Sequence, residues 1–506
     1  MRGVIPPWLP VAFVAISLAG CANLAPDRAQ PELTAQIPAD FPNSESVGDY
    51  RPEAWWTAFD DPVLDALVRD ALADNLDIAE ASARVAQAAA QARVARSALL
   101  PGINASGDAS YSNTPLSGSA FGGLAGGGGG GQQGPTRIEN DSYSLGLGAS
   151  YEIDLFGRAR NDFAAARADA IAAEYDYRSV QLAAAAETIS TYFEIVDTRR
   201  QIELTLETID LLAERATQTE ERFRRGLTQS FELYQVQQDQ RNTQASLPQQ
   251  EAALDDAHGR MALLVRQYPQ AMESRLARPL TPRLVFEEVP AGLPADLLGQ
   301  RPDVAAAWAR LEAARARVGA RRAERFPSIT LSASPGTQGG DVAGAFDIAN
   351  NWALNLAAGL TAPIFQGGRI SANIEAARAV YDQRAANYAR TVLTAYREAN
   401  SAIEDYEENR QRYALILAQL EEAQFSADLQ ARRFKAGIGD YVSYLDALRA
   451  LYQVEAALSS AGRAVALSRL GVHRALGGDW SQGIAPEPAR SNPVTMVPAP
   501  QEGTQP

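Results

Sequence analysis

The chain contains few of the residues that build disulfides, metal sites and covalent catalytic sites. Among 506 residues there are one cysteine and two histidines. A single cysteine excludes an internal disulfide bond, and His258 and His473 lie in no cluster with metal-ligand spacing. The sequence also lacks a G-x-S-x-G element and a paired-cysteine motif. We therefore predict a protein that is not an enzyme and that needs no metal or soluble cofactor.

Positive charge is also scarce. The chain has 46 basic and 61 acidic residues, a net charge of −15, and Lys435 is its only lysine. Proteins that bind nucleic acid present a basic surface to the phosphates, so no nucleic-acid partner is expected. An acidic balance suits a surface or duct that admits cations more readily than anions.

The only long apolar run lies near the N-terminus and ends at the cysteine. Trp8 to Leu18 is too short to span a membrane and is typical of a secretory signal. The sequence Leu18-Ala19-Gly20-Cys21 resembles a bacterial lipobox, which implies cleavage before Cys21 and attachment of N-palmitoyl and S-diacylglycerol groups to it. Ala22 in place of Asp implies delivery to the outer membrane. The alternative is an ordinary signal peptide with an incidental cysteine.

Glycine and proline are absent from two stretches of 68 residues each, 158–225 and 369–436. Both are rich in Ala, Glu, Arg, Leu and Gln, so each predicts one helix about 100 Å long. At an offset of 211 residues, side chains spaced by sevens match between the stretches: Ile195, Ile202, Ile209, Ala216 and Phe223 against Tyr406, Tyr413, Leu420, Ala427 and Phe434. This spacing indicates coiled-coil-like seams between helices. A helix face packed on a globular core is the alternative.

The two halves of the sequence follow one plan, which indicates an internal repeat. In each half a helix (62–100, then 302–326) precedes two strands, a 68-residue helix, a glycine turn and a returning helix. The expected segments are a signal peptide over 1–20, a lipidated N-terminal segment over 21–61, a first repeat over 62–265, a linker over 266–300, a second repeat over 301–480 and a disordered tail over 481–506.

Four segments alternate apolar side chains with small polar ones. In 142–158 the odd positions from Tyr143 to Leu155 are apolar and the even positions are polar or small, and 103–112, 328–334 and 352–361 repeat the pattern. Such strands fit a transmembrane β-barrel, or alternatively a soluble sandwich. We expect two isolated hairpins, the first with a glycine-rich loop over 117–134.

Four strands cannot close a barrel, and open strand edges are not tolerated in lipid. Several chains must therefore share their strands. Two chains would supply eight strands and a filled interior, whereas three would supply twelve strands and an open lumen.

Several motifs together resemble the TolC-like outer-membrane factors, in particular their lipoprotein branch (NodT/OprM-like outer membrane subunits of multidrug efflux pumps). The motifs are Trp55-Trp56-Thr57-Ala58-Phe59-Asp60-Asp61-Pro62, Asn75-Leu76-Asp77-Ile78, Arg301-Pro302-Asp303-Val304, Gly319-Ala320 and Phe326-Pro327-Ser328-Ile329. The similarity covers roughly residues 50–480. It implies an α+β homotrimer in which a twelve-stranded β-barrel is continuous with a twelve-helix α-barrel, with a mixed belt that includes 266–300.

The resemblance also implies a function and partners. The protein would be the passive exit duct of a tripartite efflux pump, conducting small toxic compounds or drugs from the periplasm across the outer membrane. Its partners would be a periplasmic adaptor and an inner-membrane pump, commonly proton-driven. Alternatives are a duct for type I protein secretion, a duct for heavy-metal efflux, and a structural lipoprotein tether between outer membrane and periplasm.

Residues 436–449 resemble the family's gate motif at a helical hairpin tip. Val442 and Asp446 are four residues apart on one helix face, and Arg449 follows three residues later. Three-fold symmetry would make an apolar ring and an acidic ring, and like charges repel unless they are protonated, paired or bridged by a cation. Asp446 is alternatively a solvated carboxylate or part of an ion pair between subunits.

The first repeat lacks this carboxylate. Its equivalents at the same offset are Phe231, Gln235 and Gln238, so the two halves cannot contribute equally to a gate. The turns around Gly226 and Gly437 are candidate adaptor contacts, or simply turns.

Overall fold

The computed structural model describes residues 24–26, 54–115, 137–287, 289 and 300–477. The predictions for the signal peptide, for Cys21, for the loop over 117–134 and for the tail over 481–506 lie outside the described residues. They stay predictions.

The chain forms two compact units, each built from both halves of the sequence. Unit 1 comprises residues 1–30, 88–170 and 310–385, and unit 2 comprises 31–87, 171–309 and 386–506. Unit 1 contains the strands. Unit 2 contains the turns between the long helices and the helices that return from them, and it contains the largest hydrophobic core.

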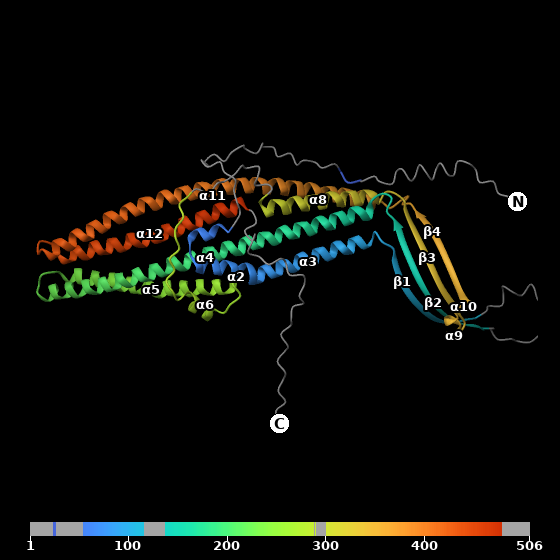
Figure 1. Cartoon of the computed structure of the whole chain (residues 1–506), viewed down its shortest axis with the longest axis horizontal. Helices are drawn as coiled ribbons and strands as arrows, with labels where there is room; N and C mark the ends of the chain where they lie inside the picture. The colour runs from blue at the N-terminus through green and yellow to red at the C-terminus, as the bar shows by residue number, and fades with distance from the viewer. Residues whose placement is uncertain (1–23, 27–53, 116–136, 288, 290–299, 478–506) are drawn as a thin grey trace, which may run out of the picture. The chain divides into compact units, whose positions relative to one another are not determined.

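The strands of unit 1 form one antiparallel sheet in the order β1-β2-β3-β4 (Figure 1). Their bounds are β1 Gly102–Pro115, β2 Arg137–Ile153, β3 Ser328–Gly339 and β4 Trp352–Thr361. The expectation of two isolated hairpins is wrong, because β2 also pairs with β3, from Tyr143 opposite Gly339 to Ile153 opposite Ile329. Where these strands meet, a Cβ on Gly336 would lie 2.8 Å from the Leu145 carbonyl oxygen, so only glycine fits the close approach.

The alternation predicted from the sequence is retained in the register. Ser150 lies opposite Ser332, and Ala149 lies opposite Ala333, which in turn lies opposite Leu356. One face is therefore small and polar, and the other carries exposed apolar side chains. Ile103, Leu147, Leu356 and Leu360 are all more than half exposed. Two short helices that the sequence did not predict, α9 (Val342–Phe346) and α10 (Ile348–Asn351), connect β3 to β4.

The helices of unit 1 meet the sheet at paired aromatic residues. Phe156, which follows β2 in the first repeat, and Phe326, which precedes β3 in the second, stack with ring centroids 4.5 Å apart. Nearby, a Cβ on Gly319 would lie 2.9 Å from the Asn161 side chain, so the glycine permits close packing of two helices. The Gly319-Ala320 motif therefore has a packing role.

The two long helices agree with the prediction to within one residue. They are α4 (Arg158–Arg224) and α11 (Arg369–Lys435), each of 67 residues. Both end one residue before the predicted boundary, because the last turn opens toward the glycine that follows. Of the helices in the described part of the chain, none is both long and apolar enough to cross a membrane.

In the core of unit 2, two short helices of residues 55–74 pack on α4. The 3-10 helix η1 (Trp55–Phe59) and α2 (Pro62–Asp74) bury Trp56, Phe59 and Leu64 against Ile189 and Tyr192. Asp61 accepts a hydrogen bond from the Val63 amide, which caps α2, and another from the Tyr192 hydroxyl. Burial and this hydrogen bond raise the pKa of Tyr192, so the phenol stays neutral. The motif Trp55–Pro62 therefore serves as a core anchor.

The single helix predicted over 62–100 is wrong, because the chain breaks at Asn75. The Asn75 side chain accepts from the amides of Asp77 and Ile78 and donates to the Leu264 carbonyl oxygen. An asparagine that caps a new helix competes with helix continuation. The second helix, α3, runs from Leu76 to Ser97.

The remaining helices of unit 2 are α5 (Ser230–Leu264), α6 (Pro269–Leu276), the beginning of α8 (Pro302–Ala323) and α12 (Tyr441–Leu476). Arg301 ties three of the helices in this unit together. Its guanidinium binds Asp303 and Glu398, both at 2.8 Å, and donates to the Ala475 carbonyl oxygen at the end of α12. Arg301 is 7% exposed, so the Arg-Pro-Asp-Val motif marks a buried helix junction.

We expect Arg301→Met to lower the free energy of unfolding by about 2–3 kcal/mol, because it leaves a carbonyl and two carboxylates without their charged donor. Thermal unfolding of the purified protein measures the change. Arg84→Met is the control, because Arg84 and Glu80 form a largely exposed pair that should contribute less than about 1 kcal/mol. Equal melting temperatures for the two variants would contradict the assigned role.

Candidate gate at the helical hairpin tips

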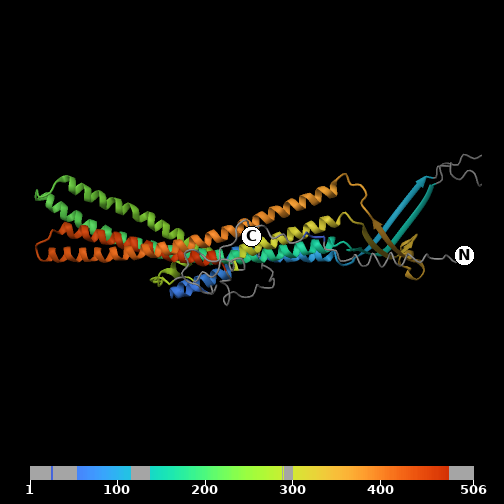
Figure 2. The same ribbon diagram turned by 90° about the horizontal axis from the view of Figure 1, so that it is seen from above.

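Two helical hairpins of unit 2 end in the same kind of turn. The α4–α5 and α11–α12 turns lie at the same end of the unit in Figures 1 and 2. Gly226 and Gly437 adopt positive φ angles of 67° and 73°. In the first turn the Leu227 amide donates to the Arg222 carbonyl, and in the second the Ile438 amide donates to the Arg433 carbonyl. These are Schellman motifs, in which glycine allows the left-handed residue.

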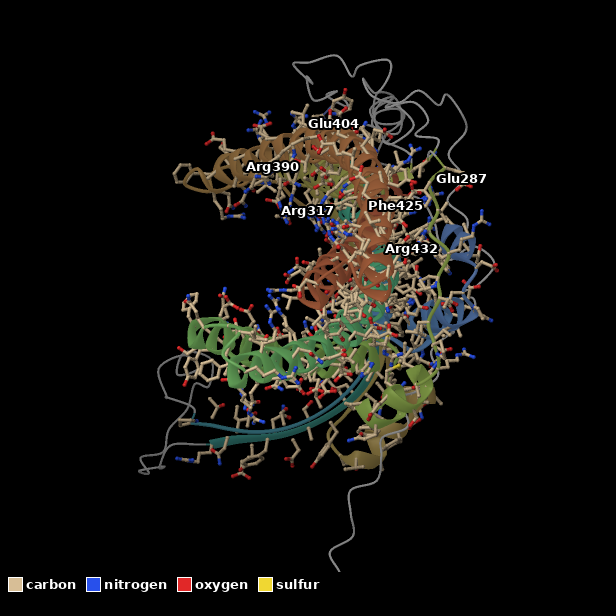
Figure 3. The ribbon with its side chains drawn as sticks, turned by 90° about the vertical axis from the view of Figure 1, so that its left-hand side faces the viewer. Glu287, Arg317, Arg390, Glu404, Phe425 and Arg432 are labelled. Carbon is tan, nitrogen blue, oxygen red and sulfur yellow. The ribbon has the colours of Figure 1, made fainter. Side chains whose placement is uncertain are left out.

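The tips carry basic and apolar side chains together. The last turn of α11 has three basic residues, Arg432, Arg433 and Lys435, and the last turn of α4 has two, Arg222 and Arg224, with Arg225 directly after the helix. Positive charge stabilises a helix C-terminus. Leu227, Phe231 and Ile438 are each at least 66% exposed. Figure 3, viewed from the tip side, labels Arg432 on α11. The tips are therefore more basic than the chain as a whole.

Asp446 pairs within the chain. Its Oδ1 lies 2.6 Å from Nη1 of Arg215 on α4. The Asp446 side chain is 53% exposed, whereas that of Arg215 is 18% exposed. The pair therefore has one end among the helices and one in solvent, and it joins α12 to α4.

Three further contacts join α12 to the first hairpin. Arg449 binds Asp239 of α5 at 3.2 Å, Asp440 binds Arg222 at 3.3 Å, and the Tyr441 hydroxyl donates to Glu214. Loss of solvent contact and this hydrogen bond raise the pKa of Tyr441 to about 12. The phenol therefore stays protonated, and able to donate, throughout the neutral range.

The predicted gate residues of the second repeat and their equivalents in the first repeat lie in different environments. Asp446 and Arg449 both form ion pairs to the first hairpin, and Val442 is half-buried beside them. The first-repeat equivalents Phe231, Gln235 and Gln238 are exposed.

The sequence analysis did not identify the partners Arg215, Asp239 and Glu214. The seven-spaced seam contained a usable signal, because Arg215 directly precedes the seam residue Ala216 and so lies beside a helix interface. That spacing does not show which helix faces Arg215.

The described residues contain no group of three or more His, Cys, Asp or Glu side chains able to hold a metal ion. His473 instead stacks on Trp55 with ring centroids 4.0 Å apart. Cys21, the predicted lipidation site, lies outside the described residues.

Comparison with known families identifies the class of this fold. A model of the outer membrane efflux protein family matches residues 67–265 and 293–478. The chain therefore belongs to the outer membrane efflux protein family.

Individual relatives are similar over most of their length. The pyoverdine export outer membrane protein OpmQ of Pseudomonas aeruginosa is 32% identical over 437 residues, which is 85% of this chain and 89% of OpmQ. The cation efflux system protein CusC of Escherichia coli is 28% identical over 480 residues, 93% of this chain and 98% of CusC. The crystal structure of the Campylobacter jejuni CmeC outer membrane channel superposes with a TM-score of 0.80 at 25% identity, covering 91% of this chain and 96% of CmeC.

These similarities confirm the predicted TolC-like α+β fold and the predicted role. The protein is an outer-membrane channel and forms the exit duct of a tripartite efflux pump. The relatives that match this chain are channel proteins.

Proposed function

We propose that the protein works as a homotrimer that passes small toxic compounds or drugs from the periplasm to the exterior. A periplasmic adaptor and an inner-membrane pump, of the proton-driven kind, complete the assembly. The duct itself is passive and the pump supplies the energy. The observation that carries the proposal is the open sheet of unit 1.

Within the described residues, β1 pairs only with β2 and β4 pairs only with β3, so the sheet has two open edges. Unpaired backbone N–H and C=O groups are costly in hydrocarbon. Pairing β4 of one copy with β1 of the next satisfies both edges, and three copies make twelve strands around a lumen. The exposed apolar face of the sheet would then contact lipid.

The lipid anchor at Cys21 is part of the proposal and is supported by the lipobox-like sequence alone. Palmitate-analogue labelling of the wild-type protein, absent from Cys21→Ala, would support it. Equal labelling of the two proteins would contradict it.

The cargo of the channel has several candidates. The names of OpmQ and CusC assign pyoverdine export and cation efflux, respectively, to these two relatives. For this chain a heavy-metal duct gains no support from the described residues, which hold no metal-binding cluster. A duct for type I protein secretion and a structural tether each predict a different phenotype when the gene is deleted.

Deleting the gene tests the cargo directly. We expect several-fold lower resistance to drugs and detergents, restored by a plasmid copy, with unchanged metal tolerance and unchanged secretion of proteins. Loss of metal tolerance alone would favour the heavy-metal duct, and loss of protein secretion alone would favour the type I duct. The purified trimer should also form stable channels in planar bilayers, and failure to do so would favour the tether.

The hairpin tips are the proposed adaptor contacts. Their basic residues suit a partner with acidic side chains, and exposed Leu227 and Ile438 supply apolar contact. Photo-cross-linkers placed at these two positions in cells should capture one periplasmic protein. Cross-linkers at exposed Leu393 and Leu415 of α11, away from the tip, are the controls. Capture of the same partner at all four positions would contradict a tip-specific contact.

We further propose that two ion pairs and one hydrogen bond from α12 to the first hairpin act as the latch of the periplasmic gate. Arg215–Asp446, Arg449–Asp239 and Tyr441–Glu214 all hold α12 in place. The intrachain pair of Asp446 replaces the repulsion expected of an unpaired acidic ring.

Asp446→Ala should therefore raise the leak conductance of the channel. A partly exposed pair contributes about 0.5–1 kcal/mol, so the effect expected is about two- to fivefold. Arg215→Ala should have a similar effect, and the double variant should add little to either. Asp428→Ala, at an exposed carboxylate 3.9 Å from Arg432, is the control. Wild-type conductance in Asp446→Ala would contradict the latch.

A further inference from the structure

Unit 2 contains a cavity of about 820 Å³ that no part of the gate or the tips uses. Its walls come from α4, α11, α12 and the segment 277–284 that follows α6. Figure 1 shows this segment as the yellow-green trace that crosses the helices. A cavity of this volume is large enough for a small organic molecule.

The segment that closes the cavity is firmly attached. The Tyr406 hydroxyl of α11 lies 3.1 and 3.0 Å from the carbonyl oxygens of Val285 and Glu287. Arg469 of α12 also donates to the Glu287 carbonyl, and Glu287 is labelled in Figure 3. The Arg283 amide donates to the Phe59 carbonyl. The cavity wall is therefore a fixed strap across the helices.

The interior of the cavity is mainly apolar. Its apolar lining includes Phe193, Val196, Leu280, Leu284, Leu420 and Leu458. The lining on the α12 side includes Gly462, where an added Cβ would lie 3.1 Å from Leu284 Cδ1. A larger side chain at Gly462 would project toward the strap and occupy the space. The absence of a side chain there helps keep the cavity open.

The charged side chains that line the cavity differ in how many of their donor and acceptor groups have partners. Arg200 binds both Glu203 and Glu455, at 2.5 and 2.6 Å, and Asp197 accepts from the Ser459 hydroxyl at 2.6 Å. The lining carboxylates are therefore already paired. Four arginines line the cavity against three carboxylates, which favours a ligand with negative charge.

Arg463 is a lining arginine of α12 whose Nη groups have only long contacts to carboxylates. Its guanidinium lies 3.8 Å from both Glu194 and Asp197, beyond hydrogen-bond distance. Its Nε is buried and has no hydrogen-bond partner among the described residues. The Arg463 side chain is 33% exposed, so a ligand carboxylate in the cavity could accept hydrogen bonds from its two Nη groups.

We propose that this cavity binds a small amphipathic carboxylate. Its ring system packs between Phe193, Leu284 and Leu458, and its carboxylate accepts hydrogen bonds from Arg463. Such a ligand touches α4, α12 and the strap at once, so it braces α12 against α4 and favours the closed channel. This second effect rests on the proposed gate, whereas the binding itself does not.

The test uses 2-naphthoate and the full-length protein in lipid nanodiscs, with empty nanodiscs subtracted. Calorimetry should show saturable binding of 2-naphthoate. The neutral 2-naphthalenemethanol and the cationic 2-naphthylmethylamine should bind about tenfold more weakly or not at all, because they lack the charge-assisted hydrogen bond. Equal binding of the three compounds, or no saturable binding of 2-naphthoate, overturns the proposal.

Two variants locate the site. Arg463→Gln should weaken 2-naphthoate binding about tenfold, and Gly462→Leu should abolish it by filling the cavity. Arg412→Gln, at an exposed arginine of α11 outside the cavity, is the matched control. Binding that is unchanged in both Arg463→Gln and Gly462→Leu places the ligand elsewhere and overturns the assignment.

The effect on the channel is measured separately. Saturating 2-naphthoate should lower the leak conductance of the wild-type protein and leave that of Gly462→Leu unchanged. Binding without any change in conductance overturns the bracing role. If Asp446→Ala shows no leak while naphthoate still binds through Arg463, the proposed gate fails and the binding site stands.

Discussion

The pairing of backbone hydrogen-bonding groups at the sheet edges is the constraint on which the rest of this protein depends. The sheet of unit 1 has four strands, an exposed apolar face and two open edges. A single copy cannot satisfy these edges in hydrocarbon. Assembly is therefore a condition of the fold rather than an addition to it.

Different kinds of interaction hold different parts of the helices of unit 2 in place. Around Tyr192, α4 is covered by a dense core of aromatic and aliphatic side chains. Asp61 and Tyr192 are buried within this core. Toward the tips, the contacts between hairpins are ion pairs and hydrogen bonds such as Arg215–Asp446 and Tyr441–Glu214. Apolar packing is lost all at once when helices separate, whereas partly exposed ion pairs exchange readily with water. Within unit 2, the contacts between the helical hairpins near their turns are therefore more readily broken than the apolar core.

The internal repeat explains both the symmetry and its limits. The two long helices have the same length and the two turns the same hydrogen bonds, because both depend on local sequence. The contacts that α12 makes with the first hairpin are not duplicated in the other repeat. Asp446 has a glutamine as its first-repeat equivalent, and Asp239 of the first repeat instead pairs with Arg449 of the second. The two hairpins are thus complementary to each other rather than equivalent.

The sequence by itself determined the elements whose causes are local. The lack of Gly and Pro specified α4 and α11, the two-residue alternation specified the strands, and Gly226 and Gly437 specified the turns. It did not reveal the break at Asn75, the pairing of β2 with β3 or the partner of Asp446. Each of these depends on a residue distant in sequence: Leu264, Ile329 and Arg215, respectively. Only the tertiary structure decided them, because hydrogen bonds and ion pairs are set by proximity in space, which a periodic pattern does not encode.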